Sequence, residues 1–308
     1  MSLTILQPGV QMTLQGAPRV GHRHLGVPAS GPADPLSMAL ANRLVGNAST
    51  ATAIEVTFGG AAISFDKSVS FAITGAQSDL ILAGRPVASH MTHFAQAGDT
   101  LRIEPARKGC RVYIAIAAAL EAADFLGSTS TYLPAALGGR AGRALKPDDT
   151  VGFGGGRNVS GLATPRDLQP VCSNSYTLRA VEGPDYPAGA QGLWDSSFNV
   201  TQRASRMGIE LEGDFPRSAE CASRPSSAIF PGALQLPPGG RGFLLLADAQ
   251  TTGGYPHILQ VVRADRHLLG QVRPGDRIRF LHRTRQQATD ALRAKQALLS
   301  SWLPDFFL

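Results

Sequence analysis

Short apolar runs broken by glycine and proline constrain this 308-residue chain more than any other feature. With 34 glycines and 21 prolines, turn-forming residues separate most apolar runs from the next. Many short strands between such turns are typical of antiparallel barrels and sandwiches. Ten runs predict β-strands: Thr4–Leu14, Ile54–Phe58, Ser68–Thr74, Leu101–Glu104, Arg111–Ala117, Tyr176–Val181, Ile209–Glu212, Phe243–Ala247, Ile258–Val262 and Ile278–Leu281.

Two segments predict helices. Asp34 is a favourable N-cap, proline follows at the first helical position, and Gly46 can end the helix, so residues 35–45 are expected to be helical. Residues 285–299 have the pattern of an amphipathic terminal helix. We therefore expect a mainly β chain with few short helices.

Two pairs of matching segments predict an internal duplication. FAITGAQ at residues 71–77 resembles LLLADAQ at 244–250, and further along GDTLRI at 98–103 resembles GDRIRF at 275–280. A Gly-Asp turn before alternating apolar and basic residues typically leads into a strand. Because the pairs occur in the same order, we expect two similar halves, with their boundary within residues 154–170.

The net charge of +6 comes from one region. Residues 263–295 carry nine basic and three acidic side chains, so the rest of the chain balances to zero. No aromatic residues alternate with these arginines to stack bases, which favours a solvated or protein-facing surface over nucleic-acid binding.

Cysteine usage and apolar run length favour a cytoplasmic protein outside the membrane. Cys110, Cys172 and Cys221 are odd in number and widely spaced, which suits neither a disulfide framework nor a metal motif. The longest apolar run, Val112–Leu120, is too short to span a bilayer. The first residues lack the pattern of a signal peptide.

Metal binding is not predicted. His22 and His24 would share one face of a strand, and His90 and His93 are three residues apart. No carboxylate follows at a spacing that would complete a site. We therefore expect scattered surface histidines.

The loop within LLLADAQTTGGYPHI, residues 244–258, is the strongest candidate for a reaction site. Its glycine pair allows close approach of a ligand, and its neutral side chains suit an amide, lactam or urea group. Asp248 or His257 would move a proton. Gln235 on the preceding strand supplies a further amide. The candidate binding residues of the loop are Gln250, Thr251, Thr252, Gly253 and Gly254. From the residues alone, a hairpin turn is an equally good interpretation.

Three other segments carry weaker signals. Residues 22–47 lead a rigid loop containing Ser30 into a helix N-terminus, which suits an anion, although Asp34 as N-cap would compete for that place. Arg206, at the start of a strand, would pair with a carboxylate or lie at a solvated edge. Glu55 is expected on the less buried face of its strand.

Standard nucleotide and biotin machinery is absent from the sequence. There is no GxxxxGK[ST] phosphate loop, and no lysine lies between methionines as a biotin acceptor would. Any ATP or biotin chemistry is therefore expected to be shared with another polypeptide.

Six motifs in order give a family resemblance: GVPASGPADPLSMALANRLVGN, AIEVTFGG, SRMGIELEG, GALQLPPGG, DAQTTGGYP and GQVRPGDRIRF. Over roughly residues 3–282 the chain resembles the biotin-dependent carboxyltransferase family, which includes the C-type subunit of 5-oxoprolinase, also labelled allophanate hydrolase subunit 2, and the matching part of urea carboxylase. The resemblance implies two cyclophilin-like β-barrel subdomains, residues 1–160 and 161–308, with strand exchange allowed between them.

The resemblance also implies an activity and partners. The implied reaction is the ATP-dependent opening of 5-oxoproline to glutamate by an amidohydrolase complex, in which phosphorylation activates the lactam carbonyl. The implied partners are a companion subunit of B type and a third subunit of A type. ATP would be bound by or shared with a partner, and biotin would take part only in a carboxyltransferase acting on a urea-like substrate. A regulatory protein that antagonises a kinase inhibitor is a third alternative.

The resemblance places the substrate among residues of the second half. Gln235 and Gln250 would bind the amide, Gly253 and Gly254 would admit it, and Ser30 with Asp34 would form another wall. Arg263 falls where urea-using relatives carry lysine, and we include it among the binding candidates. Two further departures from the family pattern are Ala33, in place of Met, and Ala249, in place of a larger residue.

Overall fold

The structure, a computed structural model of the chain, describes residues 1–216 and 225–308 and consists of two compact units. Unit 1 comprises Met1–Arg19, Asp34–Cys172 and Leu298–Phe307, and unit 2 comprises Val20–Ala33, Ser173–Ala297 and Leu308. The subdomain limits 1–160 and 161–308 stay a prediction.

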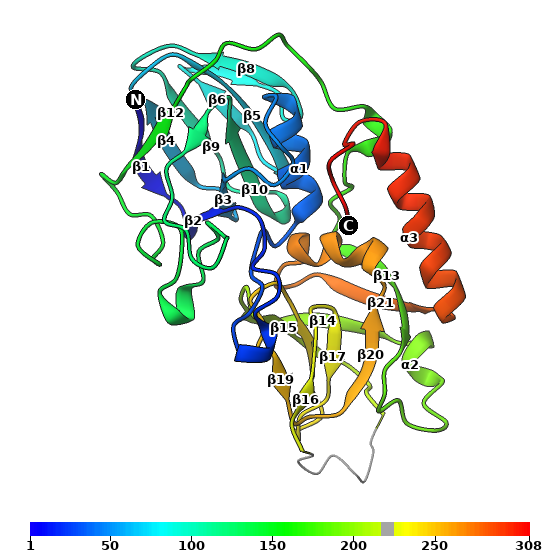
Figure 1. Cartoon of the computed structure of the whole chain (residues 1–308). Coiled ribbons are helices and arrows are strands. Elements are labelled where there is room, and N and C mark those ends of the chain that lie inside the picture. Colours follow the sequence, from blue (N-terminus) through cyan, green and yellow to red (C-terminus); the bar gives the residue numbers. More distant parts are fainter. Residues whose placement is uncertain (217–224) are drawn as a thin grey trace. The chain divides into compact units, whose positions relative to one another are not determined.

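Unit 1 is built from two sheets and one long helix (Figure 1). In spatial order, the seven-stranded sheet contains β11 (Ala119–Leu120), β12 (Thr150–Gly154), β1 (Ser2–Pro8), β4 (Ala61–Phe65), β9 (Thr100–Ile103), β6 (Leu80–Leu82) and β7 (Arg85–Val87). The five-stranded sheet contains β2 (Gln11–Gln15), β3 (Ala53–Thr57), β10 (Lys108–Ile116), β5 (Val69–Gln77) and β8 (Thr92–Ala95). Helix α1 (Pro35–Leu44) packs against β5 and β10, and short 3-10 turns cover Leu133–Ala135 and Arg166–Leu168.

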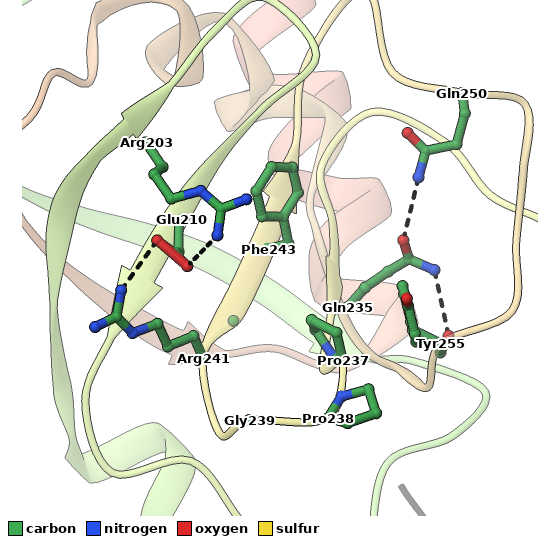
Figure 2. Close-up of a pocket in the computed structure, with 11 residues that line it drawn as sticks. Arg203, Glu210, Gln235, Pro237, Pro238, Gly239, Arg241, Phe243, Gln250 and Tyr255 are labelled. Carbon is green, nitrogen blue, oxygen red and sulfur yellow. Dashed lines mark hydrogen bonds and ion pairs between the residues drawn. The ribbon is translucent and has the colours of Figure 1, made fainter. Parts of the chain in front are cut away.

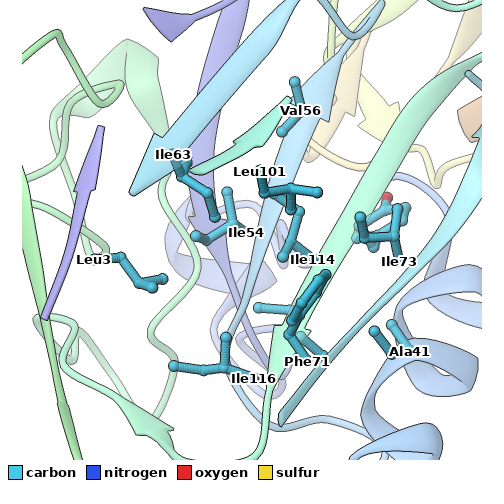
Figure 3. Packing of buried hydrophobic residues seen from close by; sticks show 14 of the residues in the cluster. Leu3, Ala41, Ile54, Val56, Ile63, Phe71, Ile73, Leu101, Ile114 and Ile116 are labelled. Atoms are coloured by element: carbon cyan, nitrogen blue, oxygen red, sulfur yellow. The ribbon is translucent and has the colours of Figure 1, made fainter. Parts of the chain in front are cut away.

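The core of unit 1 lies among these strands and α1. Ile54, Ile114 and Ile73 lie opposite one another on the neighbouring strands β3, β10 and β5, and Figure 3 shows them in one cluster with Phe71 and with Ala41 of α1. Each of these side chains is almost fully removed from solvent. Since burying one large aliphatic or aromatic side chain stabilises a fold by roughly 1.5–3 kcal/mol, this cluster is the main source of stability of the unit.

Unit 2 is a closed barrel (Figure 1, green to orange). In spatial order its strands are β13 (Ser175–Glu182), β20 (His257–Val261), β17 (Ala233–Gln235), β18 (Gly242–Leu245), β15 (Gly208–Glu212), β14 (Ser197–Ala204) and β21 (Arg277–His282). A parallel pairing of β13 with β21 closes the ring. The remaining elements are a two-stranded ribbon of β16 (Ser227–Ala228) and β19 (Thr252–Gly253), helix α2 (Gly192–Asp195), and 3-10 helices at Arg23–Leu25 and Arg263–Gln271. Helix α3 (Arg285–Ser300) belongs to unit 2 up to Ala297, and its last turn belongs to unit 1.

The mainly β fold with few helices is confirmed. Asp34 caps α1 as expected, accepting a hydrogen bond from the backbone N–H of Ser37 at 3.0 Å. Helix α3 matches the expected terminal helix closely. The 3-10 helix at Arg263–Gln271 was not expected, because the segment is short and mostly polar, and Val262 before it provides no side-chain cap.

One expected strand and one expected pair of histidines differ from the structure. The expected Thr4–Leu14 strand is two strands in two different sheets, separated at Gly9. Gly9 has φ 66°, and a Cβ there would lie 2.4 Å from the carbonyl oxygen of Gly59, so only glycine fits this corner. His22 and His24 do not share a strand face, because residues 23–25 form a 3-10 turn.

The prediction for Glu55 is wrong. Its side chain is buried, and its carboxylate accepts a hydrogen bond from Tyr113 Oη at 2.7 Å and lies 3.4 Å from Arg111 Nε. Every residue of β3 is buried, so alternation of apolar and polar residues does not mark an exposed face there.

The two Gly-Asp turns make the same backbone contacts. The N–H of Gly98 donates to Phe65 and Phe65 donates back to Asp99, and Gly275 exchanges the equivalent pair with Val200 through Asp276. The other matched pair differs, because FAITGAQ stays in β5 to its last residue whereas LLLADAQ leaves β18 after Leu245. The duplication itself stays a prediction.

The remaining expectations concern cysteines and membranes. Cys110 and Cys172 are buried, and the Cys172 thiol donates to the carbonyl oxygen of Gly75 at 3.8 Å, while Cys221 lies outside the described residues. Within residues 1–216 and 225–308, the helices are too short or too polar to cross a bilayer.

Candidate functional site

A row of three side chains crosses the outer face of the barrel in unit 2. Glu210 on β15 lies opposite Phe243 on β18, which lies opposite Gln235 on β17. Side chains directly opposite each other on neighbouring strands point to the same face. Their apolar sequence neighbours Ile209 and Leu244 are buried in the barrel core, so the alternation of each strand sends this row outward.

This row forms the floor of a cavity of about 580 Å³ (Figure 2). The volume is within the range of about 300–1,000 Å³ that is usual for small-molecule sites. Its lining residues are Arg203, Glu210, Gln235, Pro237, Pro238, Gly239, Arg241, Gly242, Phe243, Gln250 and Tyr255. The structure thus brings together Gln235 and Gln250, the two expected amide binders.

The amide end of the cavity holds two glutamine side chains in loose contact. Gln250 Nε2 donates to Gln235 Oε1 at 3.5 Å, and Gln235 Nε2 donates to the carbonyl oxygen of Tyr255 at 3.2 Å. A contact of 3.5 Å is at the outer limit of a hydrogen bond, so a ligand can replace it at little cost. Figure 2 shows both amide groups on the same side of Phe243.

Gly253 makes room for the Gln235 amide. A Cβ at residue 253 would lie 2.5 Å from Gln235 Nε2 and 2.9 Å from Ile229 Cδ1. Glycine at this position therefore leaves the space that the Gln235 side chain occupies, and its predicted role in admitting a substrate stays a prediction.

The other end of the cavity is an open cluster of charges, formed by Arg203, Arg241 and Glu210. Arg203 Nη1 lies 3.3 Å from Glu210 Oε1, and Arg241 Nη1 lies 3.2 Å from Glu210 Oε2. Thr201 Oγ1 also donates to Glu210 Oε2, at 3.0 Å. Both arginines are largely exposed whereas Glu210 is buried, so the carboxylate is a fixed anchor for two accessible guanidinium groups.

A second charge pair in unit 2, Arg206 with Asp248, is closed to solvent. Arg206 Nε donates to Asp248 Oδ2 at 2.8 Å, and Arg206 Nη2 donates to the carbonyl oxygen of Gly31. Ser30 Oγ donates to Asp248 Oδ1 at 2.7 Å. This pair therefore fixes residues 30 and 31 beside the loop that follows β18. Asp248 and Arg206 are not among the described residues that line the cavity.

His257 lies opposite Gln235, on β20. Burial lowers the pKa of this imidazole, so it is neutral at pH 7, and its backbone N–H donates to Asp185 at 2.9 Å. Its buried Nε2 has no hydrogen-bond partner within the described part of the chain. The catalytic roles of His257 and Asp248 stay predictions.

The other expected residues are more scattered. Thr251 is buried next to the ribbon, Thr252 pairs with Ala228 in it, and Gly254 follows it. Arg263 is exposed at the start of a 3-10 helix. Asp34 is fully buried in unit 1, where Ser37 uses both carboxylate oxygens, while Ser30 belongs to unit 2.

A metal centre was not expected, and the described residues contain no group of three or more metal-ligating side chains in ligand geometry. His93 Nε2 instead lies 2.6 Å from the carbonyl oxygen of Ala88.

The family described as "Carboxyltransferase domain, subdomain A and B" matches residues 25–282 of this chain. The chain belongs to this carboxyltransferase domain family. It is 32% identical to the C-type subunit of 5-oxoprolinase from Escherichia coli (strain K12) over 298 residues, which cover 96% of this chain and 95% of that protein. It is 31% identical to the urea amidolyase of Lachancea kluyveri, covering 96% of this chain and 18% of that protein.

The solved urea amidolyase of K. lactis has the same fold. It superimposes on 98% of this carboxyltransferase domain chain with a TM-score of 0.91 and 25% sequence identity. The superimposed region is 20% of the urea amidolyase chain. The chain therefore spans about a fifth of that enzyme and nearly the whole of the E. coli 5-oxoprolinase polypeptide that it matches.

The sequence left the arginines of the open cluster unassigned. Thr201 and Arg203 are two residues apart on β14 and both contact Glu210, so the period-2 spacing was a signal. Arg241 follows PPGG directly, and nothing in its local sequence indicates that it reaches Glu210. Only the pairing of β14 and β18 with β15 brings the three side chains together.

Proposed function

We propose that this chain is the lactam-binding subunit of a 5-oxoprolinase-type complex. The observation that carries the proposal is its similarity to the C-type subunit of E. coli 5-oxoprolinase over nearly the full length of both. The urea amidolyases match at similar identity, but in them the matched region is a small part of the polypeptide. The cavity of unit 2 supports the proposal because it holds two amide groups beside an aromatic floor.

The amide pair has the arrangement that a lactam requires. A lactam is a cis amide, so its N–H and C=O point to the same side of the ring. Gln250 Nε2 would donate to the lactam carbonyl and Gln235 Oε1 would accept from the lactam N–H, which replaces their present 3.5 Å contact. The rings of Phe243 and Tyr255 line the same cavity and would pack against the carbons of the substrate.

Asp248 has a positioning role in this proposal. Its carboxylate is held by Arg206 and Ser30, two residues before Gln250, and is therefore shielded from a substrate in the cavity. His257, like Asp248, is not among the described residues that line the cavity, but it is neutral and lies opposite Gln235, so in this proposal it is the group that would accept a proton.

ATP would supply phosphoryl activation of the lactam carbonyl. The chain has no phosphate-loop motif, so we assign nucleotide binding to a companion subunit or to a site shared with it. The proposed partners are a companion of B type and a third subunit of A type.

The test is reconstitution. The chain is purified together with its proposed companion subunits, and ATP hydrolysis is measured with and without 5-oxoproline, with glutamate quantified as the product. We expect ATP hydrolysis that depends on 5-oxoproline. Absence of this dependence with all subunits folded and assembled would refute the proposal.

Replacing Gln250 tests whether the cavity is the site. Gln250→Ala removes the donor to the lactam carbonyl and should abolish turnover while the thermal unfolding midpoint stays unchanged. Gln286→Ala on the exposed surface of α3 makes the same chemical change elsewhere and should retain activity. Wild-type turnover in Gln250→Ala would remove the cavity from the reaction.

A second function is supported by the similarity to the urea amidolyases. In that case the amide pair would bind a urea-like substrate, and the carboxyl group would come from biotin on another polypeptide. Urea-dependent ATP hydrolysis with a biotin carboxylase partner, and none with 5-oxoproline, would favour this second function.

A further inference from the structure

We infer that Arg203 and Arg241 bind a carboxylate of the substrate, so that the cavity recognises an anionic amide and discriminates against a neutral one. The inference rests on the proposed function, in which the two glutamines bind the lactam group, and it adds the group that the two arginines bind. It makes these two arginines specificity-determining residues.

The first observation is the exposure of the guanidinium groups. The side chains of Arg203 and Arg241 are 75% and 50% exposed, whereas that of Glu210 is 6% exposed. Each arginine contacts Glu210 through Nη1, which leaves most of the five N–H donors of its guanidinium group accessible to a ligand.

The second observation is the charge of the cluster. Two guanidinium groups share one buried carboxylate, so the open cluster has an excess positive charge on the cavity wall. Glu212 lies 3.9 Å from Arg241 Nη2 but is itself exposed, so water screens this interaction. A planar carboxylate that accepts from both arginines would complete the cluster with charge-assisted hydrogen bonds.

The third observation is the arrangement of the two ends. In Figure 2, Arg203, Glu210 and Arg241 lie on one side of Phe243, and Gln235 and Gln250 lie on the other. The cavity therefore has a cationic end and an amide end separated by a ring-sized apolar surface. A small lactam whose ring carries a carboxylate has an amide, apolar ring carbons and an anionic group, and therefore matches both ends of the cavity. Urea has no anionic group for the cationic end.

Glu210 holds the two arginine side chains in place before a ligand binds. Long arginine side chains lose considerable rotamer entropy when a ligand immobilises them. Because Glu210 already restrains both, part of that cost is met before binding. Glu210 is in turn held by Thr201, so the anchor does not depend on the ligand.

The experiment compares two probes of the same ring. 5-Oxoproline carries the carboxylate and 2-pyrrolidinone is the same lactam without it. Binding of each to the full-length chain is measured by ligand-observed NMR and calorimetry, and the reconstituted complex gives the substrate concentration at half-maximal turnover. We expect 5-oxoproline to bind at least about tenfold more tightly than 2-pyrrolidinone, since each tenfold corresponds to about 1.4 kcal/mol.

Single substitutions identify the residues responsible. Arg203→Gln and Arg241→Gln should each weaken 5-oxoproline binding about tenfold or more and leave 2-pyrrolidinone binding unchanged. Arg241→Lys, which keeps the charge, should recover part of the loss. Arg279→Gln, an exposed arginine of the same barrel, is the matched control and should change neither affinity. Single replacements leave Glu210 with one arginine and preserve the fold, which thermal unfolding checks.

The outcomes separate this inference from the proposed function. If the complex turns over 5-oxoproline but neither arginine variant changes the preference for the carboxylated probe, the inference is wrong and the proposed function stands. If the complex shows no turnover while the chain binds 5-oxoproline through these arginines, the inference stands and the proposed function fails. Equal or absent binding of both probes overturns the inference.

Discussion

Unit 2 contains two groupings of arginine with carboxylate, and their surroundings differ sharply. In the closed pair, the side chains of Arg206 and Asp248 are 4% and 2% exposed, and both have further partners in the backbone or in Ser30. In the open cluster, the side chains of Arg203 and Arg241 are 75% and 50% exposed around a buried Glu210. The first grouping is saturated by the protein, whereas the second still has donors for a ligand.

Both groupings pair arginine with a carboxylate, so the residue types alone do not indicate the role of an ion pair; its burial does. A buried pair has lost its hydration, so removal of either partner leaves an uncompensated charge. An exposed pair contributes little to stability because water competes for both ions. The closed pair is therefore expected to stabilise the fold, and the open cluster is expected to bind the carboxylate of a ligand.

The largest expected effect is on stability at the closed pair. Arg206→Gln should lower the free energy of unfolding by about 3–5 kcal/mol, because Asp248 would remain buried and charged without its main partner. Urea denaturation followed by circular dichroism measures this change. Arg203→Gln makes the same replacement in the open cluster and should cost less than about 1 kcal/mol. Similar losses in both variants would contradict the distinction between the two groupings.

Low pH is expected to destabilise unit 2 through the buried His267, which is not part of the open cluster. Burial, and secondly the charge of Lys295, lower the pKa of His267 to about 3. Because an unfolded histidine has a pKa near 6.5, the unfolded state binds more protons below that value, and stability falls as pH drops from 6.5 toward 3.

The contribution of His267 to the slope is at most about 1.4 kcal/mol per pH unit, or roughly 2–3 kcal/mol between pH 6.5 and 4.5, and buried His257 adds to it in the same direction. His267→Gln should flatten this part of the stability curve, measured by urea denaturation at several pH values. An unchanged slope would show that His267 is not the group responsible. Ligand affinities of the variants are best compared above pH 6.5, because the contribution of His267 to the stability of the fold no longer changes with pH there.

The smallest expected effect is at the amide end of the cavity. Gly253→Ala would place a Cβ 2.5 Å from Gln235 Nε2, which must then move. We expect about fivefold weaker binding of 5-oxoproline, close to 1 kcal/mol, with little change in stability because the displaced atoms end flexible side chains. Gly192→Ala, where an added Cβ meets no atom within 4 Å, is the control. Unchanged affinity in Gly253→Ala would mean that the Gln235 amide does not contact the lactam.

Much of the fold could be predicted from sequence because its signals are local. The cap of α1 depends on Asp34 and the proline after it, and the helix begins where these residues place it. Strands such as β15 alternate apolar and charged residues, and Ile209 and Leu211 do enter the barrel core. Prediction failed where both faces of a strand are covered, as at Glu55, and where one glycine turns the chain between sheets, as at Gly9.

The candidate site could be predicted only in part. Gln250 was found because its loop carries a glycine pair, and Gln235 was found as a further amide on the preceding strand; both line the cavity. Arg203 and Arg241 were missed because their common partner lies on a third strand, and pairing of strands distant in sequence leaves no local signal.

The sequence by itself determined the mainly β class, the limits of helices α1 and α3 and the amide-bearing loop, because capping, alternation and turn formation depend on neighbouring residues. The tertiary structure decided which arginine is buried and which is open, because burial depends on the strands and loops that meet around a side chain. Arg203 and Arg206 are three residues apart in sequence, yet one borders the cavity and the other closes an ion pair within the protein.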